Sequence, residues 1–154
     1  MSQKAVLLVC LGNICRSPMA EAALRAEAVA QGLALTIDSA GTNGLHTGEG
    51  ADPRAVAEAA RHGSDLSSHR ARQVTSEDFL RFGHIYALDH QNLRELHRIS
   101  PRRPLAKVGL LLDMVPGRAG QAVIDPYYGT AQDFATAWDD VAKAAKYIVA
   151  YLSR

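Results

Sequence analysis

One short segment near the N-terminus limits the possible folds of this chain more than any other feature. An apolar run at residues 5–9, Ala-Val-Leu-Leu-Val, leads directly into Cys-Leu-Gly-Asn-Ile-Cys-Arg-Ser at residues 10–17. A continuous apolar run of this length is typical of a parallel strand that is covered on both faces. Pro18 suits the first turn of a helix and Ser17 is a good N-cap. The segment therefore predicts a buried strand, a short loop and a helix that begins near Ser17.

The predicted loop carries the residue types of an anion-binding site. Free N–H groups at a helix start favour an anion, and Gly12 and Asn13 tolerate the left-handed backbone that lets successive amides point into one concavity. Arg16 can bind two phosphate oxygens with its planar guanidinium. The same field favours the thiolate of Cys10, which is a competent nucleophile toward a phosphate ester, and the Ser17 hydroxyl can hydrogen-bond the sulfur. A cysteine six residues before an arginine is weak evidence alone, so the strand–loop–helix context carries the prediction.

A second candidate site is the segment Asp125-Pro126-Tyr127-Tyr128. Cleavage of a phosphate ester needs a proton for the departing oxygen, and a carboxylic acid can give that proton and then act as a base toward water. Pro126 restricts the backbone around Asp125, and the two tyrosines can form an aromatic wall for a flat substrate. An Asp-Pro pair alone more often starts a turn, so the prediction depends on both segments together.

Together these segments resemble the low-molecular-weight protein tyrosine phosphatases. The similarity covers nearly the whole chain and includes residues 38–42, 68–73 and 88–89. The resemblance implies that Cys10 becomes a phosphocysteine, that Ser17 stabilises the thiolate, and that Asp125 is the general acid and then the base. It also implies a phosphate-binding loop, with the Cys-x5-Arg spacing, whose amides and guanidinium bind the phosphoryl oxygens: Leu11, Gly12, Asn13, Ile14, Cys15 and Arg16.

The resemblance further implies a supporting network and a redox pair. Asn13 is expected to hold the strained loop through bonds to Ser39 and His69, with Asp89 supporting His69. Cys10 and Cys15 are expected to form a reversible disulfide that shields the nucleophile. The predicted wall of the substrate pocket consists of Ile14, Leu45, Tyr127 and Tyr128.

Three functions are weighed from these residues. Relatives that reduce arsenate need further cysteines for a disulfide relay, and this chain has two cysteines in all. Protein-arginine phosphatases resemble this family but carry Thr where Ile14 stands, and an apolar Ile14 fits an aromatic ring better than a guanidinium. Phosphotyrosine is therefore the predicted substrate, and phosphoarginine or small aryl phosphates are the alternative. A non-catalytic phosphoprotein-binding module is the third reading, and the presence of both Cys10 and Asp125 argues against it.

Composition limits partners and location. The chain has 154 residues and a net charge of +1, which fits one domain over residues 1–154 and gives no field that recruits nucleic acid or an acidic membrane. The six histidines form no metal motif, so no metal and no cofactor are expected. The apolar run after residue 4 is too short for a signal peptide or a membrane span, so a cytoplasmic protein is expected. The sequence leaves the oligomeric state open, and a monomer is the default expectation. Expected partners are phosphotyrosine proteins, with a bacterial tyrosine kinase as one candidate, and phosphate or other oxyanions as inhibitors.

The remaining pattern alternates strands and helices. Strands are predicted at residues 35–40, 84–88 and 107–112, and a Gly-rich loop over the site at residues 41–51. Helices are predicted from Asp52-Pro53 to Gly63, after a capping box at Thr75 and Asp78, and from Thr130 onward. This alternation predicts a parallel sheet with helices on both faces, and the resemblance specifies a single-domain three-layer sandwich with four strands in the order 2-1-3-4. The active loops are then expected at the carboxyl ends of the strands.

Overall fold

A parallel four-stranded sheet lies at the centre of the molecule, in the order β2-β1-β3-β4. The computed structural model describes residues 4–154, so the first three residues of the predicted domain lie outside the described part. The strands are β1 (Ala5–Cys10), β2 (Thr36–Gly41), β3 (His84–Ala87) and β4 (Lys107–Leu110). β1 is buried along its whole length because it is central and covered on both faces. The predicted strand order and parallel pairing are confirmed.

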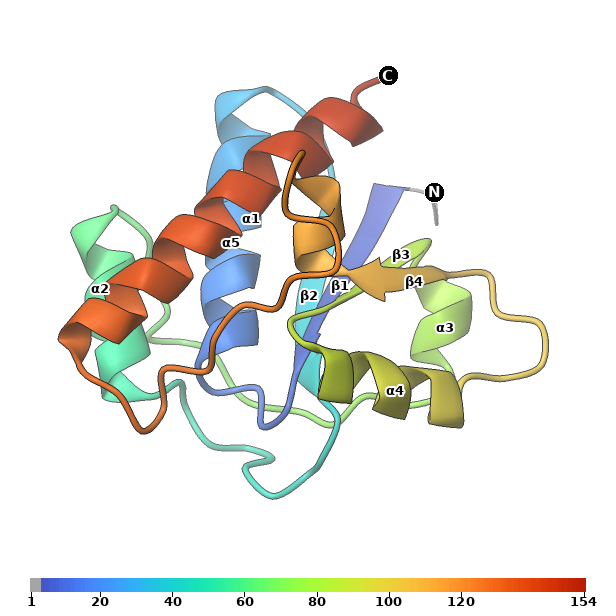
Figure 1. Ribbon diagram of the computed structural model, residues 1–154, viewed down its shortest axis with the longest axis horizontal. Helices are drawn as coiled ribbons and strands as arrows, with labels where there is room; N and C mark the ends of the chain where they lie inside the picture. Colours follow the sequence, from blue (N-terminus) through green and yellow to red (C-terminus); the bar gives the residue numbers. More distant parts are fainter. Residues whose placement is uncertain (1–3) are drawn as a thin grey trace.

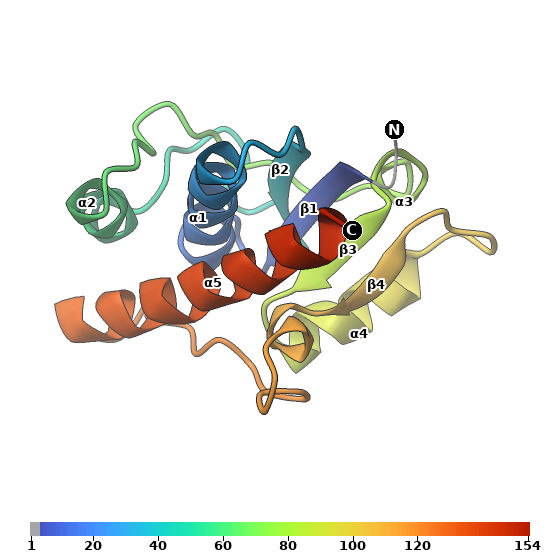
Figure 2. The same ribbon diagram turned by 90° about the horizontal axis from the view of Figure 1, so that it is seen from above.

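Helices cover both faces of the sheet (Figures 1 and 2). One face carries α1 (Arg16–Ala30) and α5 (Ala131–Leu152), with α2 (Pro53–Arg61) packed against these two helices, and the other face carries α3 (Asp78–Arg81) and α4 (His90–Ile99). Alternate side chains of β1 separate the two layers of the core. Val6 and Leu8 belong to the cluster that includes α1 and α5, whereas Leu7 and Val9 belong to the cluster that includes α3 and α4. The three-layer α/β architecture predicted from the sequence is confirmed.

The ends of several elements differ from the prediction. Helix α1 begins at Arg16, with Cys15 as an N-cap that has no side-chain bond, so the prediction that Ser17 caps this helix is wrong. The Ser17 hydroxyl lies 2.9 Å from the Cys10 sulfur instead. β4 ends at Leu110 because the chain turns into the 3-10 helix η2 (Leu111–Met114). No helix was specified between the third and fourth strands, yet α4 forms there with Asp89 as its N-cap.

Capping residues explain where two of the other helices begin. Asp52 caps α2 by accepting the Arg54 N–H at 2.8 Å, as the Asp-Pro pair predicted, although the helix ends at Arg61. Thr130 and Asp133 form a full capping box at the start of α5. The box predicted at Thr75 is incomplete, because Asp78 accepts the Thr75 N–H but the helix begins at Asp78 itself.

No helix within residues 4–154 has both the length and the apolar character that a bilayer crossing needs.

Candidate active site

The loop at residues 10–16 places a sulfur and a guanidinium at the carboxyl end of the sheet. Cys10 is the last residue of β1 and Arg16 is the first residue of α1, and both are 3% exposed. The Cys10 sulfur accepts the backbone N–H of Asn13 at 3.3 Å and lies 2.9 Å from the Ser17 hydroxyl. These two neighbours can stabilise negative charge on the sulfur. The structure thus brings Cys10, Arg16 and Ser17 together as the sequence predicted.

Asn13 holds the loop in its conformation. Its φ of 59° places it in the left-handed region. Among residues 4–154, Asn13 alone has a positive φ without being a glycine. Its amide nitrogen donates to the hydroxyls of Ser17 at 2.8 Å and Ser39 at 3.0 Å. Its amide oxygen accepts the Arg72 N–H at 3.0 Å, and its carbonyl oxygen accepts from His69 Nε2 at 2.7 Å. The predicted links of Asn13 to Ser39 and His69 are therefore present.

Arg16 donates two hydrogen bonds and lies near a further carboxylate, and one of these contacts corrects a prediction. Its Nη1 donates to Asp89 at 2.8 Å and to the carbonyl of Val123 at 2.9 Å, and its Nη2 lies 3.6 Å from the Asp125 carboxylate. The expectation that Asp89 supports His69 is wrong, because Asp89 bonds Arg16 with one oxygen and caps α4 with the other. The reason is positional: Asp89 caps α4, which begins beside the guanidinium, whereas His69 contacts the loop through the Asn13 carbonyl.

A pocket of about 320 Å³ opens above this loop. Asp125 lies on its lining with Tyr127 and Tyr128, so the two candidate segments meet although they are far apart in the sequence. One Asp125 oxygen accepts the Tyr127 N–H at 3.1 Å, and the carboxylate is 45% exposed. Each residue predicted for the wall lines this pocket: Ile14, Leu45, Tyr127 and Tyr128. The supporting residues Ser39, His69 and Asp89 do not line it, in keeping with a structural role.

Several residues at the site were not found from the sequence. Asn43 and His46 line the pocket from the loop after β2, and the His46 ring packs against Gly12, where a Cβ atom would meet it at 2.9 Å. Glu21 accepts the Ser39 hydroxyl at 2.6 Å and so extends the network of Asn13. The sequence signal for Asn43 and His46 was the predicted Gly-rich loop over the site. The sequence carries no signal for the role of Glu21, because the packing of α1 against β2 determines its contact with Ser39.

Cys15 has an environment different from that of Cys10. Both cysteines are free and buried. Burial, and then the negative charge of Asp52, raises the pKa of the Cys15 thiol well above its usual range. Cys15 is therefore a neutral thiol at physiological pH, and the Asp52 carboxylate beside it has a lowered pKa, chiefly because Arg54 hydrogen-bonds it.

The arrangement can bind a tetrahedral oxyanion and attack it. A buried sulfur at the floor, a guanidinium beside it, and a carboxyl group at the mouth are the groups that nucleophilic and acid–base catalysis at a phosphate ester need. Within residues 4–154, no group of three or more His, Cys, Asp or Glu side chains is arranged to hold a metal ion.

Comparison with known proteins agrees with this chemistry. The sequence model of a family described as low molecular weight phosphotyrosine protein phosphatase matches residues 5–154. A low molecular weight protein-tyrosine-phosphatase of Streptomyces coelicolor is 50% identical over 134 residues, which are 84% of this chain and 81% of that protein. The crystal structure of a protein tyrosine phosphatase from Entamoeba histolytica aligns with a TM-score of 0.91 at 34% identity, over 97% of this chain and 96% of that one. The structure of DARP, a drosophila arginine phosphatase, aligns with the same TM-score at 29% identity, over 97% of this chain and 98% of that one.

Proposed function

The chain belongs to the low molecular weight phosphotyrosine protein phosphatase family, and from that premise we propose that Cys10, Arg16, Ser17 and Asp125 hydrolyse phosphotyrosine in proteins. The observation that carries the assignment of roles is the convergence of three groups on one pocket. The Cys10 sulfur lies at its floor, the Arg16 guanidinium beside it and the Asp125 carboxyl group 3.6 Å from that guanidinium.

The reaction proceeds in two displacements at phosphorus. The Cys10 thiolate attacks, the S–P bond forms as the bond to the phenolic oxygen breaks, and protonated Asp125 gives its proton to that oxygen. Asp125 then removes a proton from water, the water oxygen attacks phosphorus, and the S–P bond breaks to release inorganic phosphate and the Cys10 thiolate. Arg16 and the amides of residues 11–16 stabilise the charge on the phosphoryl oxygens in both steps.

The hydrogen bonds around the sulfur suit its second role as a leaving group. The Ser17 hydroxyl at 2.9 Å and the Asn13 N–H at 3.3 Å can stabilise the thiolate as the phosphocysteine is hydrolysed. Asp89 holds Arg16 in the position where its guanidinium faces the pocket. Ser17 thus takes part in the chemistry, and Asp89 positions Arg16.

The pocket wall supports an aromatic substrate. Ile14 lies at the lip, and the rings of Tyr127 and Tyr128 meet edge to face with centroids 4.9 Å apart. An apolar and aromatic wall fits a phenyl ring better than a hydrated guanidinium. The structural likeness to an arginine phosphatase nevertheless makes phosphoarginine the second candidate substrate.

The finer assignments belong to the same proposal. Residues 1–154 act as one monomeric domain in the cytoplasm. Phosphotyrosine proteins, among them an autophosphorylated bacterial tyrosine kinase, are the substrates, and inorganic phosphate and other oxyanions compete for the loop. A peroxide oxidises the Cys10 sulfur to a sulfenic acid and is itself reduced, and the Cys15 thiol then displaces water from that sulfenic acid to form a reversible Cys10–Cys15 disulfide. Both cysteines are free and belong to one short loop.

A kinetic panel with matched phosphopeptides tests the proposal. We expect kcat/KM to be highest for phosphotyrosine peptides, lower for phosphoarginine peptides, and abolished for both by Cys10→Ser. The variant should still bind vanadate or phosphate, because the amides and Arg16 remain. Near wild-type turnover by Cys10→Ser would reject the nucleophile, and a preference for phosphoarginine would reverse the substrate assignment. Wild-type protein that binds phosphate without releasing it from any ester would leave a binding module as the function.

A further inference from the structure

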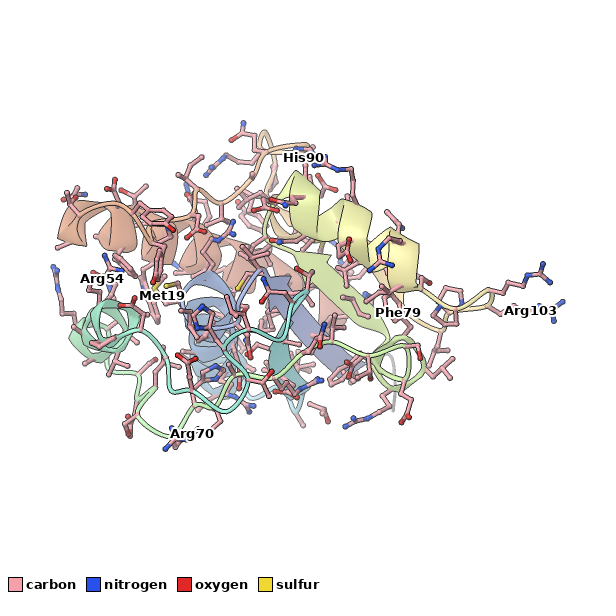
Figure 3. The ribbon with its side chains drawn as sticks, turned by 90° about the horizontal axis from the view of Figure 1, so that it is seen from below. Met19, Arg54, Arg70, Phe79, His90 and Arg103 are labelled. Carbon is pink, nitrogen blue, oxygen red and sulfur yellow. The ribbon has the colours of Figure 1, made fainter. Side chains whose placement is uncertain are left out.

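Arg54 contacts the aromatic wall from behind. It lies on the first turn of α2, between that helix and the start of α5 (Figure 3). Its guanidinium carbon is 5.5 Å from the ring centroid of Tyr127 and 4.7 Å from that of Phe134. Tyr127 lines the pocket, whereas Arg54 and Phe134 do not. We infer that Arg54 is a positioning residue: it fixes the Tyr127 ring and so makes the pocket select aryl over alkyl phosphates.

Asp52 fixes the guanidinium in turn. Its two oxygens accept from Arg54 Nε at 3.0 Å and from Arg54 Nη2 at 2.9 Å, a bidentate pair that an ammonium group cannot reproduce. Phe134 is 1% exposed, so the ring beneath the guanidinium is itself packed in the core. A long side chain normally loses favourable conformational entropy when it is ordered. Here the helix cap and the buried ring have already ordered Arg54, although it is 43% exposed.

Asp52 and Arg54 also connect the Tyr127 side of the pocket wall to the phosphate-binding loop. The Asp52 N–H donates to the Ile14 carbonyl at 2.8 Å, so α2 begins at a fixed place relative to the loop. The side chains of Asp52 and Arg54 then extend from that point to the ring of Tyr127. The phosphate-binding loop is therefore linked to the ring of Tyr127 through Asp52 and Arg54.

A comparison of two ligands, inorganic phosphate and an aryl phosphate, distinguishes this positioning role from a general structural role of Arg54. Inorganic phosphate needs the loop and Arg16 alone, whereas an aryl phosphate also needs the wall. A cation–π contact contributes roughly 0.5–2 kcal/mol, which corresponds to about 2- to 30-fold in an equilibrium constant. Loss of Arg54 should thus weaken aryl ligands and leave phosphate binding unchanged.

The inference rests on the proposed function, since it concerns the wall of that substrate pocket, and the test uses Arg54→Gln and Arg54→Lys. We expect Arg54→Gln to raise KM for phenyl phosphate about 3- to 10-fold, with kcat for the same ester within about twofold. KM for a simple alkyl phosphate and the inhibition constant of inorganic phosphate should not move. Arg54→Lys keeps the charge but not the bidentate pair, and should fall between Arg54→Gln and wild type. Arg61→Gln, on the last turn of the same helix and away from the pocket, is the matched control.

A double variant asks whether Arg54 acts through Tyr127. In a Tyr127→Ala background, Arg54→Gln should have no further effect on KM for phenyl phosphate, because the ring that it positions is gone. An additive effect would overturn the inference. So would an unchanged KM in the single variant, or an equal rise in the inhibition constant of phosphate.

A binding measurement separates the two proposals. Titration with phenylphosphonate and with inorganic phosphate needs no turnover, so it decides the role of Arg54 even if the wild-type protein proved catalytically inactive. Weaker phenylphosphonate binding by Arg54→Gln with unchanged phosphate binding would support the inference in that case. Equal binding of phenylphosphonate by the variant and by wild type would refute it. Absence of turnover by wild type would instead refute the catalytic proposal.

Discussion

Replacement of Asn13 by Ala and by Gly separates two contributions to the phosphate-binding loop. Ala removes both the side-chain bonds and the tolerance for the φ of 59°, whereas Gly removes the bonds alone. Three side-chain hydrogen bonds are lost in both variants, to Ser17, Ser39 and the Arg72 N–H. At about 0.5–1.5 kcal/mol each, this loss lowers the free energy of unfolding by roughly 2–4 kcal/mol.

The backbone term distinguishes the two variants. A left-handed backbone lowers the stability of the alanine variant by about 1–2 kcal/mol. Glycine adopts this backbone without strain, but the greater entropy of its unfolded chain lowers the stability of the glycine variant by roughly 0.5–1 kcal/mol. Asn13→Ala should therefore be the less stable variant, by up to about 1.5 kcal/mol. Urea unfolding measures this difference, and both variants should stay folded if the wild type has an ordinary stability of about 5–15 kcal/mol.

The same pair has a functional readout. The Asn13 N–H faces the Cys10 sulfur only while residue 13 keeps its left-handed backbone, so Ala should also weaken phosphate binding more than Gly does. Inhibition constants for inorganic phosphate measure this effect. If Asn13→Ala were as stable as Asn13→Gly and bound phosphate equally well, the reasoning from backbone strain would be refuted.

Three further predictions follow from the site and the sheet. Asp125→Asn should lower kcat most for aryl phosphates with poor leaving groups, since these need the proton most, and a series of substituted phenyl phosphates measures this. Asp89→Asn should raise the inhibition constant of phosphate by about tenfold, because Arg16 loses a charged partner at 2.8 Å. Burial, and then Lys107, holds the pKa of His84 below its ordinary value of 6.5. The unfolded chain therefore binds a proton more readily below that value, and His84→Gln should reduce the loss of stability between neutral and mildly acidic pH, as measured by urea unfolding.

Each of these predictions has a contrary outcome. An equal loss of kcat across all leaving groups would argue against Asp125 as the acid. Unchanged phosphate inhibition in Asp89→Asn, with the Asp89→Ala variant also unchanged, would show that Arg16 needs no such partner. Wild type and His84→Gln with the same slope of unfolding free energy against pH would exclude His84 as a source of acid sensitivity.

The features predicted from the sequence were those whose signals are local. The apolar run of β1, the residues of the loop and the alternation of elements agree with one another, so they specify the sheet and the place of Cys10. Ser17 shows where a local rule fails. A serine near a helix start can bond a backbone N–H or another partner, and here the sulfur and the Asn13 amide take the hydroxyl. The general preference of serine for the N-cap position does not predict which of these partners the Ser17 hydroxyl takes.

Contacts between loops could not be predicted in the same way. Asp89 bonds Arg16 because α4 begins beside the phosphate-binding loop, and that position depends on how α4 packs on the sheet. His46 reaches Gly12 across a long loop, and Arg54 meets Tyr127 only after α2 and the segment before α5 have docked. Each of these contacts joins parts of the chain that have no sequence pattern in common.

The unequal exposure of the pocket has a consequence for how such an enzyme diversifies. The floor residues Cys10 and Arg16 are 3% exposed, whereas Leu45 and Tyr128 at the rim are 79% and 95% exposed. Substitutions at exposed positions usually change stability by less than about 0.5 kcal/mol, while those in the core are costly. Natural variants can therefore acquire new preferences at the rim with almost no loss of stability, and the inherited chemistry at the floor is left intact for the next round of selection.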